Sequence, residues 1–168
     1  RQGRMSTGFD HAAVTPTLAE KALAFLDGQT RDRPFFLYVA LPSPHTPWLP
    51  TRAFRGRSKA GEYGDFVCQV DDVVGRLRKK LADIGVSSQT LFVFTSDNGP
   101  VWYPADTKRL GHDSAGGLRG MKGDAWEAGH RVPMIVSWPR HTPQEAVSEE
   151  ITCHTDFFAT FAEIMGDA

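Results

Sequence analysis

Three short stretches of the chain combine residue types that can bind ions or transfer protons. The first is "TSDNGP", in which Asp97 and Asn98 follow an apolar run directly. One charged and one neutral oxygen donor at adjacent positions suit Ca²⁺ or Mg²⁺ better than a softer metal. Asp-Asn-Gly is also ordinary turn chemistry, because Gly99 tolerates a positive φ. The pair therefore predicts either a hard-metal site or a simple turn.

The second stretch is "PSPHTPWLP", where His45 stands among four prolines. Proline restricts the backbone, so this loop can hold an imidazole in one orientation for proton transfer or hydrogen bonding. A histidine in a surface loop is also often a passive polar residue. On this pattern alone, His45 is either a functional residue or a passive surface histidine.

The third stretch is the glycine-rich segment 111–131, which gathers the cationic and titratable side chains His112, Arg119, Lys122, His130 and Arg131. Glycines let backbone N–H groups approach an anion, and cationic side chains match a sulfate or phosphate. The alternative is a flexible basic loop without a ligand.

Composition limits the classes of function. The chain has 168 residues, of which 40% are hydrophobic and 23% charged, typical of one globular domain. With 19 basic and 20 acidic residues it carries no net field for nucleic acid or an anionic membrane, so any anion site must be local. No run of apolar residues is long enough for a membrane span. Cys68 and Cys153 form no recognisable disulfide framework, so their redox state stays open.

Hydrophobic periodicity predicts the elements that must position these stretches. The expected elements are a helix from Pro16 to about Gly28, a buried strand over 35–41, a helix over 66–84, strands over 90–96 and 132–138, and a final helix with Thr155 as its N-cap. Helices alternating with strands indicate an α/β fold with a largely parallel sheet and flanking helices. In such sheets the polar ends of the strands carry the chemistry, and all three stretches lie there.

Three motifs in this order carry a resemblance to a known family. "ALPSPHTPW", "VFTSDNG" and "LRGMKGDAWEAGHRVPMIVSWP" resemble the later part of the catalytic domain of the type I sulfatases, arylsulfatase-like members of the alkaline phosphatase superfamily. The resemblance covers most of the chain, and it implies a partial alkaline-phosphatase-like α/β sandwich. It also implies hydrolysis of sulfate esters, with an aryl sulfate or a sulfated glycan as substrate.

The resemblance implies roles for individual residues. Asp97 and Asn98 match calcium ligands, with magnesium as the second choice. Lys122 matches the lysine at the sulfate and its bridging oxygen, and His45 matches the histidine at the leaving-group oxygen. His112 and Arg119 are assigned to substrate binding, and Glu127 to a structural pairing with a nearby arginine.

Other family motifs are not found in these residues. They are the cysteine or serine motif that becomes the formylglycine nucleophile, the early acidic pair of the calcium site and the "GKWH" stretch. We therefore expect 1–168 to be the later part of a sulfatase domain that needs the rest of the sulfatase chain, and to be inactive alone. By resemblance the parent is secreted, periplasmic or lysosomal. Two alternatives stay open: a phosphomonoester, phosphodiester or phosphonate hydrolase of the same superfamily, and a catalytically dead module that binds sulfated glycans.

Overall fold

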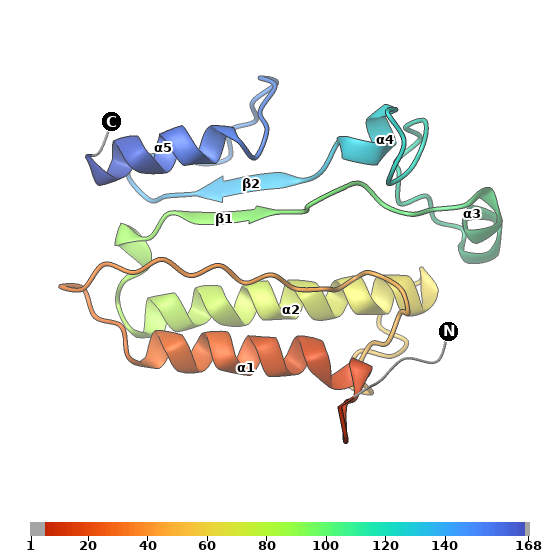
Figure 1. Ribbon diagram of the computed structural model, residues 1–168, viewed down its shortest axis with the longest axis horizontal. Helices are drawn as coiled ribbons and strands as arrows, with labels where there is room; N and C mark the ends of the chain where they lie inside the picture. The colour runs from red at the N-terminus through yellow and green to blue at the C-terminus, as the bar shows by residue number, and fades with distance from the viewer. Residues whose placement is uncertain (1–5, 167–168) are drawn as a thin grey trace.

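The computed structural model describes residues 6–166. Its helices are α1 (Val14–Asp27), α2 (Gly61–Asp83), α3 (Pro104–Leu110), α4 (Glu127–His130) and α5 (Asp156–Met165), with short 3-10 helices η1 (His11–Ala13) and η2 (Ser87–Gln89) and strands β1 (Phe92–Thr95) and β2 (Met134–Ser137). Helices and strands lie in layers, with α1 and α2 on one side and the strands and α5 on the other (Figure 1). The α/β class predicted from the periodicity is therefore present.

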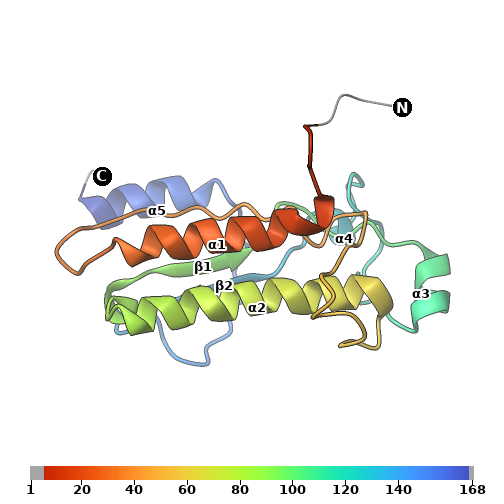
Figure 2. The ribbon, with the colours of Figure 1, turned by 90° about the horizontal axis from the view of Figure 1, so that it is seen from below.

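The core lies between α1, α2 and the extended chain above them. Its fully buried members recur at helical spacing on the facing sides of the two helices, because that spacing places them on one stripe: Ala19, Ala22, Leu26, Val73, Leu77 and Leu81, joined by Val86. Figures 1 and 2 show the two helices side by side and running in the same direction. Glu20 pairs with Arg76 on their outer surface at 2.6 Å, and Asp27 pairs with Lys80.

The segment 35–41 differs from the predicted strand. It forms no strand in the described chain but an extended run whose alternate residues Phe35, Leu37, Val39 and Leu41 pack on the core. Phe36 and Tyr38 on its other face are 76% and 79% exposed, so the segment is half-buried, not buried. The aromatic and β-branched run predicts a buried strand; the chain is extended there, but no hydrogen-bonded neighbour that would define a strand is found among residues 6–166.

The sheet direction also differs from the prediction. β1 and β2 pair antiparallel, with Val93 opposite Val136 and Thr95 opposite Met134. The expectation of a largely parallel sheet is wrong for this pair, because the long connection between the strands turns the chain back at the same end. Segment 35–41 does run in the direction of β1, as a crossover through α2 requires (Figure 1).

The start of α2 differs from the boundary that periodicity predicts. α2 begins at Gly61, five residues before the predicted start at Phe66. The buried carboxylate of Asp65 there accepts hydrogen bonds from Gly56 N at 2.6 Å and Ser58 N at 2.8 Å. These bonds fix the loop before α2 and lower the pKa of Asp65 more than burial raises it.

The N-cap of α5 and the whole of α3 also differ from the prediction. Thr155 stands at the N-cap position of α5, but its side chain makes no capping bond; instead the Asp156 carboxylate accepts from Cys153 N at 2.8 Å. Helix α3 lies where a loop is expected from periodicity, although Pro104 at its first turn and left-handed Gly111 at its end are ordinary helix signals.

The loops that carry the candidate residues gather at one end of the molecule. The chain passes through this end after segment 35–41, after β1 and before β2, on the right-hand side of Figure 1. Among the described residues no helix is long and apolar enough to cross a membrane.

Candidate functional site

The first part of the candidate site is the turn that follows β1. The Ser96 hydroxyl donates to Asn98 O at 3.0 Å, and the Asn98 amide donates from Nδ2 to Gly99 O at 2.9 Å. Within residues 6–166 the carboxylate of Asp97 and the Oδ1 atom of Asn98 make no hydrogen bond or ion pair, and Asp97 is exposed. The turn thus leaves two adjacent oxygen donors uncommitted.

These two donors fit part of a hard-metal site. Ca²⁺ takes six to eight oxygen ligands, often a mixture of carboxylates and carbonyls. In the described part of the chain no three His, Cys, Asp or Glu side chains are grouped closely enough to hold a metal. Asp97 and Asn98 therefore match a fraction of a calcium shell.

The Lys122 loop is attached to this turn through the backbone. Lys122 N donates to Pro100 O at 2.8 Å, and Gly99 N donates to Gly129 O at 3.0 Å. Gly99 is glycine for a steric reason, because a Cβ there would lie 1.7 Å from Ala128 O. The two segments approach closely, and the backbone of Lys122 is hydrogen-bonded to Pro100, which is three residues after Asp97.

Lys122 occupies a tight turn of its own. Asp124 N donates to Met121 O at 2.9 Å, and the Asp124 carboxylate accepts from Met121 N at 3.0 Å. Gly123 has φ +91°, the left-handed conformation that such a turn needs at its third position. The exposed Lys122 side chain projects from the second position of this turn.

The acidic side chains of the loop are used internally. Asp113 accepts from Ala115 N at 2.9 Å and Gly117 N at 2.8 Å, and Asp124 accepts from Met121 N. Glu127 lies 3.4 Å from Arg131 and 3.9 Å from His130, which confirms the pairing expected for Glu127.

Two cations of the loop have no carboxylate partner in the described chain: Lys122 and Arg119. The Arg119 guanidinium lies over the Trp126 ring, with Cζ 3.5 Å from the ring centroid. The sequence analysis did not single out Trp126, because a separation of seven residues across a glycine-rich loop gives no periodic signal.

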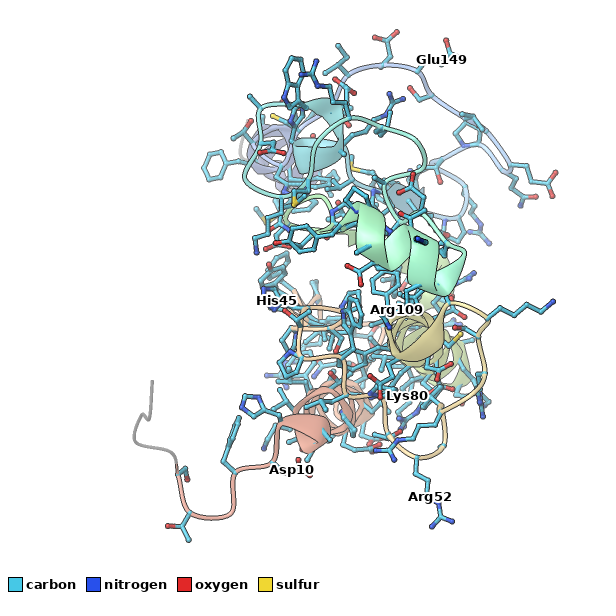
Figure 3. All side chains as sticks on the ribbon, turned by 90° about the vertical axis from the view of Figure 1, so that its right-hand side faces the viewer. Asp10, His45, Arg52, Lys80, Arg109 and Glu149 are labelled. Carbon is cyan, nitrogen blue, oxygen red and sulfur yellow. The ribbon has the colours of Figure 1, made fainter. Side chains whose placement is uncertain are left out.

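His45 is held by its proline-rich loop. His45 N donates to Pro42 O at 3.0 Å, and its Nδ1 lies 2.7 Å from Thr46 O. Hydroxyls of Ser43 and Thr15 bond to each other and attach the loop to α1. Because a carbonyl only accepts, Nδ1 carries a proton, so Nε2 can donate only when the ring is the imidazolium. Figure 3 shows His45 at the surface of the end that carries α3.

An aromatic cluster connects the three loops, and sequence reasoning missed it. Buried Trp102 has its ring centroid 5.9 Å from Trp48, 4.7 Å from Tyr63 and 5.6 Å from His112. Its indole N–H is 3.1 Å from His112 O. Burial raises the pKa of Tyr63, so the phenol stays neutral at ordinary pH.

The structure brings some of the candidate residues together and leaves others apart. Backbone hydrogen bonds join the Lys122 loop to the turn of Asp97 and Asn98. His112 is exposed beside the aromatic cluster. His45 makes no hydrogen bond or ion pair with the other candidates among residues 6–166, and its loop reaches them through Trp48.

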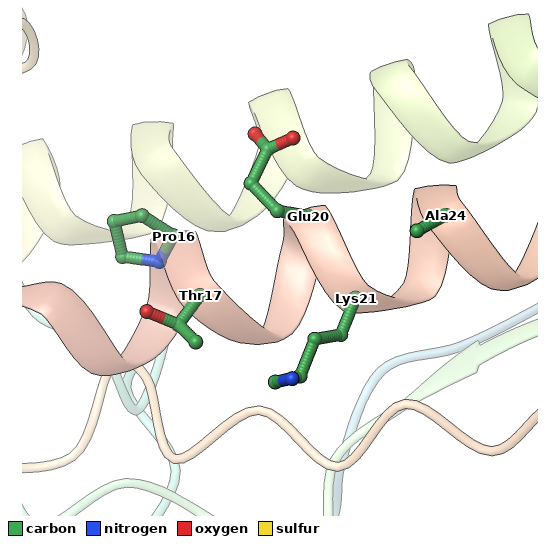
Figure 4. Close-up of a pocket in the computed structure, with 5 residues that line it drawn as sticks. All are labelled: Pro16, Thr17, Glu20, Lys21 and Ala24. Atoms are coloured by element: carbon green, nitrogen blue, oxygen red, sulfur yellow. The ribbon is translucent and has the colours of Figure 1, made fainter.

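A shallow hollow elsewhere lacks this chemistry. It runs along α1 and is lined by Pro16, Thr17, Glu20, Lys21 and Ala24 (Figure 4). It shares no lining residue with the three loops. Its one cation, Lys21, stands next to the carboxylate of Glu20 in the sequence, whereas the loops hold the candidate residues.

Comparison with known proteins decides the family. A family model described as Sulfatase matches residues 6–167, almost the whole chain. The chain belongs to the sulfatase family. The resemblance of its three motifs is thereby confirmed.

Curated relatives of this sulfatase-family chain have moderate identity. Mouse steryl-sulfatase is 39% identical, and the match covers 94% of the chain and 25% of the steryl-sulfatase. Human arylsulfatase A is 36% identical, and the match covers 90% of the chain and 30% of the arylsulfatase. Human N-acetylgalactosamine-6-sulfatase is 35% identical, and the match covers 92% of the chain and 29% of that relative. The chain thus spans between a quarter and a third of the length of these relatives.

Solved structures confirm the fold class. A protein described under the metabolism of multiple glycosaminoglycans by Bacteroides thetaiotaomicron aligns with TM-score 0.83 and 32% identity over 95% of the chain and 34% of its own. Ps i-CgsB, solved in complex with k-i-k-neocarrahexaose, aligns with TM-score 0.78 and 30% identity, and the alignment covers 92% of the chain and 34% of Ps i-CgsB. The chain therefore has part of the sulfatase fold.

Proposed function

We propose that the protein containing this chain hydrolyses sulfate esters, and that residues 1–168 are the later part of its catalytic domain. Family membership supports the reaction class. The observation that carries the proposal is the backbone attachment of the Lys122 loop to the Asp97–Pro100 turn, through the 2.8 Å and 3.0 Å hydrogen bonds. This attachment joins the backbone of the turn that carries the uncommitted oxygen donors to the loop that carries Lys122.

In the proposal Asp97 and Asn98 hold a calcium ion together with ligands from the other part of the domain. When bound, the ion supplies positive charge at the sulfate oxygens. The nucleophile, a formylglycine in the family, also belongs to the other part, because neither Cys68 nor Cys153 lies in the required motif. Both cysteines are free thiols in the described structure.

Lys122 acts on the sulfate in this proposal. Its ammonium is a compact charge on a flexible stem, suited to one oxygen at a time. The bridging oxygen gains negative charge as its bond to sulfur breaks, so a positive charge there stabilises the transition state more than the ground state. The lack of a described carboxylate partner leaves the Lys122 charge available for this role.

His45 supplies the proton in this proposal. As the S–O bond breaks, the leaving oxygen takes a proton from Nε2 of the His45 imidazolium, and the ring returns to its neutral form. The Nδ1 contact with Thr46 O holds the ring orientation throughout. His112 and Arg119 contact the remainder of the substrate.

We infer the substrate class and the location of the parent from its family resemblance. Its substrate is a small-molecule or glycan sulfate ester, and the named relatives include both steryl and N-acetylgalactosamine sulfatases. We place the parent in a secreted, periplasmic or lysosomal compartment, as the family resemblance implies.

Full-length parent enzyme provides the test. We expect it to hydrolyse 4-methylumbelliferyl sulfate, to prefer it over the matching phosphate, and to lose turnover with a calcium chelator. Lys122→Ala should lose activity, whereas Lys108→Ala, which removes an exposed lysine of α3, should not. Preference for the phosphate would favour the phosphoester alternative. Binding of sulfated glycans without turnover would favour the catalytically dead module.

A further inference from the structure

Arg119 and Trp126 form the closest cation–π contact in the described chain. The guanidinium carbon lies 3.5 Å from the ring centroid, against 4.6 Å for Arg57 over Phe54 and 5.9 Å for Arg109 over Trp48. At 3.5 Å the guanidinium carbon is in van der Waals contact with the face of the ring. The Trp126 ring is 49% exposed, so the pair lies at the surface.

The backbone around this pair is fixed. Ala128 N donates to Arg119 O at 3.0 Å, and Gly129 N donates to Trp126 O at 2.8 Å. Gly120 has φ +90°, and a Cβ there would lie 2.7 Å from Trp126 Cβ. The stacked pair is therefore built into the same loop that attaches to the turn of Asp97.

Stacking leaves the hydrogen-bonding capacity of Arg119 unused. The five N–H donors of a guanidinium lie in its plane, whereas stacking on Trp126 occupies its face. Among residues 6–166 no acceptor takes a hydrogen bond from the Arg119 side chain. Arg109 and Arg131 differ, because each pairs with a carboxylate.

We infer that Arg119, positioned by Trp126, binds a second acidic group of the substrate beside the sulfate that Lys122 contacts. A planar fork held in one orientation suits a carboxylate or a further sulfate, which offers two oxygens in one plane. Arg119 is then a binding residue and Trp126 a positioning residue. This inference rests on the proposed function, and it makes the site selective for substrates with two acidic groups.

The test uses equilibrium binding to the full-length parent, measured by calorimetry in the presence of a calcium chelator so that the probes are not hydrolysed. Two matched pairs of probes are phenyl sulfate with 3-carboxyphenyl sulfate, and glucose 6-sulfate with glucose 3,6-disulfate. We expect the doubly acidic member of at least one pair to bind about tenfold to a hundredfold more tightly. Arg119→Gln and Trp126→Ala should remove this excess, so that the two members of a pair bind with similar affinity, whereas Trp126→Phe should retain most of it.

Matched controls separate binding from structure. Arg57→Gln removes another stacked arginine, and Tyr103→Ala removes an aromatic ring of similar exposure, 54%. Both should leave the excess intact. The inference is overturned if neither doubly acidic probe binds more tightly, if the excess survives Arg119→Gln, or if Trp126→Ala weakens both members of a pair equally, as a purely structural role would.

The binding readout is independent of turnover. A parent that discriminates between the probes through Arg119 but hydrolyses no sulfate ester would contradict the proposed function and support this inference. A parent that hydrolyses sulfate esters without such discrimination would do the reverse.

Discussion

Gly99 is the position where one methyl group should separate the two halves of the candidate site. Its φ is not in the left-handed region, so alanine introduces no backbone strain there. The new Cβ would nevertheless lie 1.7 Å from Ala128 O, 2.8 Å from Ala128 C and 3.0 Å from Gly129 C. These are backbone atoms, which cannot rotate away as a side chain can.

The size of the effect follows from these distances. Ordinary van der Waals contact begins at 3.4 Å, so the Ala128 carbonyl must retreat by about 1.7 Å. This shift stretches the hydrogen bond from Gly99 N to Gly129 O and carries the Lys122 loop away from Asp97. Misplacement of a catalytic group by ~1 Å can cost ~100-fold in rate. We therefore expect Gly99→Ala to lower kcat/KM by at least about 100-fold, or ~2.7 kcal/mol.

The assay compares two glycine variants of the full-length parent. Gly99→Ala should lose sulfatase kcat/KM and about 1–3 kcal/mol of stability through overpacking. Gly75→Ala, inside α2 with no atom within 4 Å of its added Cβ, should keep kcat/KM and gain up to about 1 kcal/mol. Steady-state kinetics and thermal unfolding on both variants separate the local steric effect from the general effect of adding a methyl group.

One result would refute the reasoning. If Gly99→Ala kept normal kcat/KM and normal stability, the Asp97–Pro100 turn and the Lys122 loop could not be in the contact described. A loss of stability with full activity would show that the contact exists but does not position Lys122.

Four further predictions concern metal, charge, pH and the isolated chain. Asp97→Ala in the parent should lower both bound calcium, measured by atomic absorption, and turnover by orders of magnitude, since a metal contributes several kcal/mol; normal calcium content would support the simple turn. Lys122→Ala should lower kcat more for aryl sulfates with poor leaving groups than for good ones, and Lys122→Arg should rescue little; a loss confined to KM would make Lys122 a ground-state binding residue. Because the pKa of Asp65 is lowered in the folded state, its carboxylate contributes stability above the unfolded-state pKa, and this contribution is lost as pH falls through the folded-state pKa. Unfolding temperatures of wild type and Asp65→Asn should therefore differ at neutral pH, and the difference should shrink as pH falls below about 4. A difference that stayed constant would argue against the carboxylate bonds. Residues 1–168 alone should show no calcium-dependent hydrolysis of nitrophenyl sulfate, because they lack the nucleophile; measurable turnover would contradict the proposed division of the domain.

The sequence by itself indicated the two long helices and the candidate residues for polar chemistry. Apolar residues at helical spacing predicted α1 and α2, since only one stripe of a helix can be buried against its neighbour. The polar ends of apolar runs located Asp97, Asn98 and His45, and glycines mixed with cations located Lys122. These signals are local, and a single sequence displays them.

The tertiary structure decided which residues meet. Periodicity predicts which face of a strand is buried but not which strand lies beside it. It therefore predicted a strand at 35–41 that the described chain does not form, and a largely parallel sheet where β1 and β2 pair antiparallel. The attachment of Gly99 to Gly129 and the stacking of Arg119 on Trp126 depend on the path of a long loop through space. Such contacts are set by steric fit and backbone hydrogen bonding between distant segments, which leave no periodic trace in the sequence.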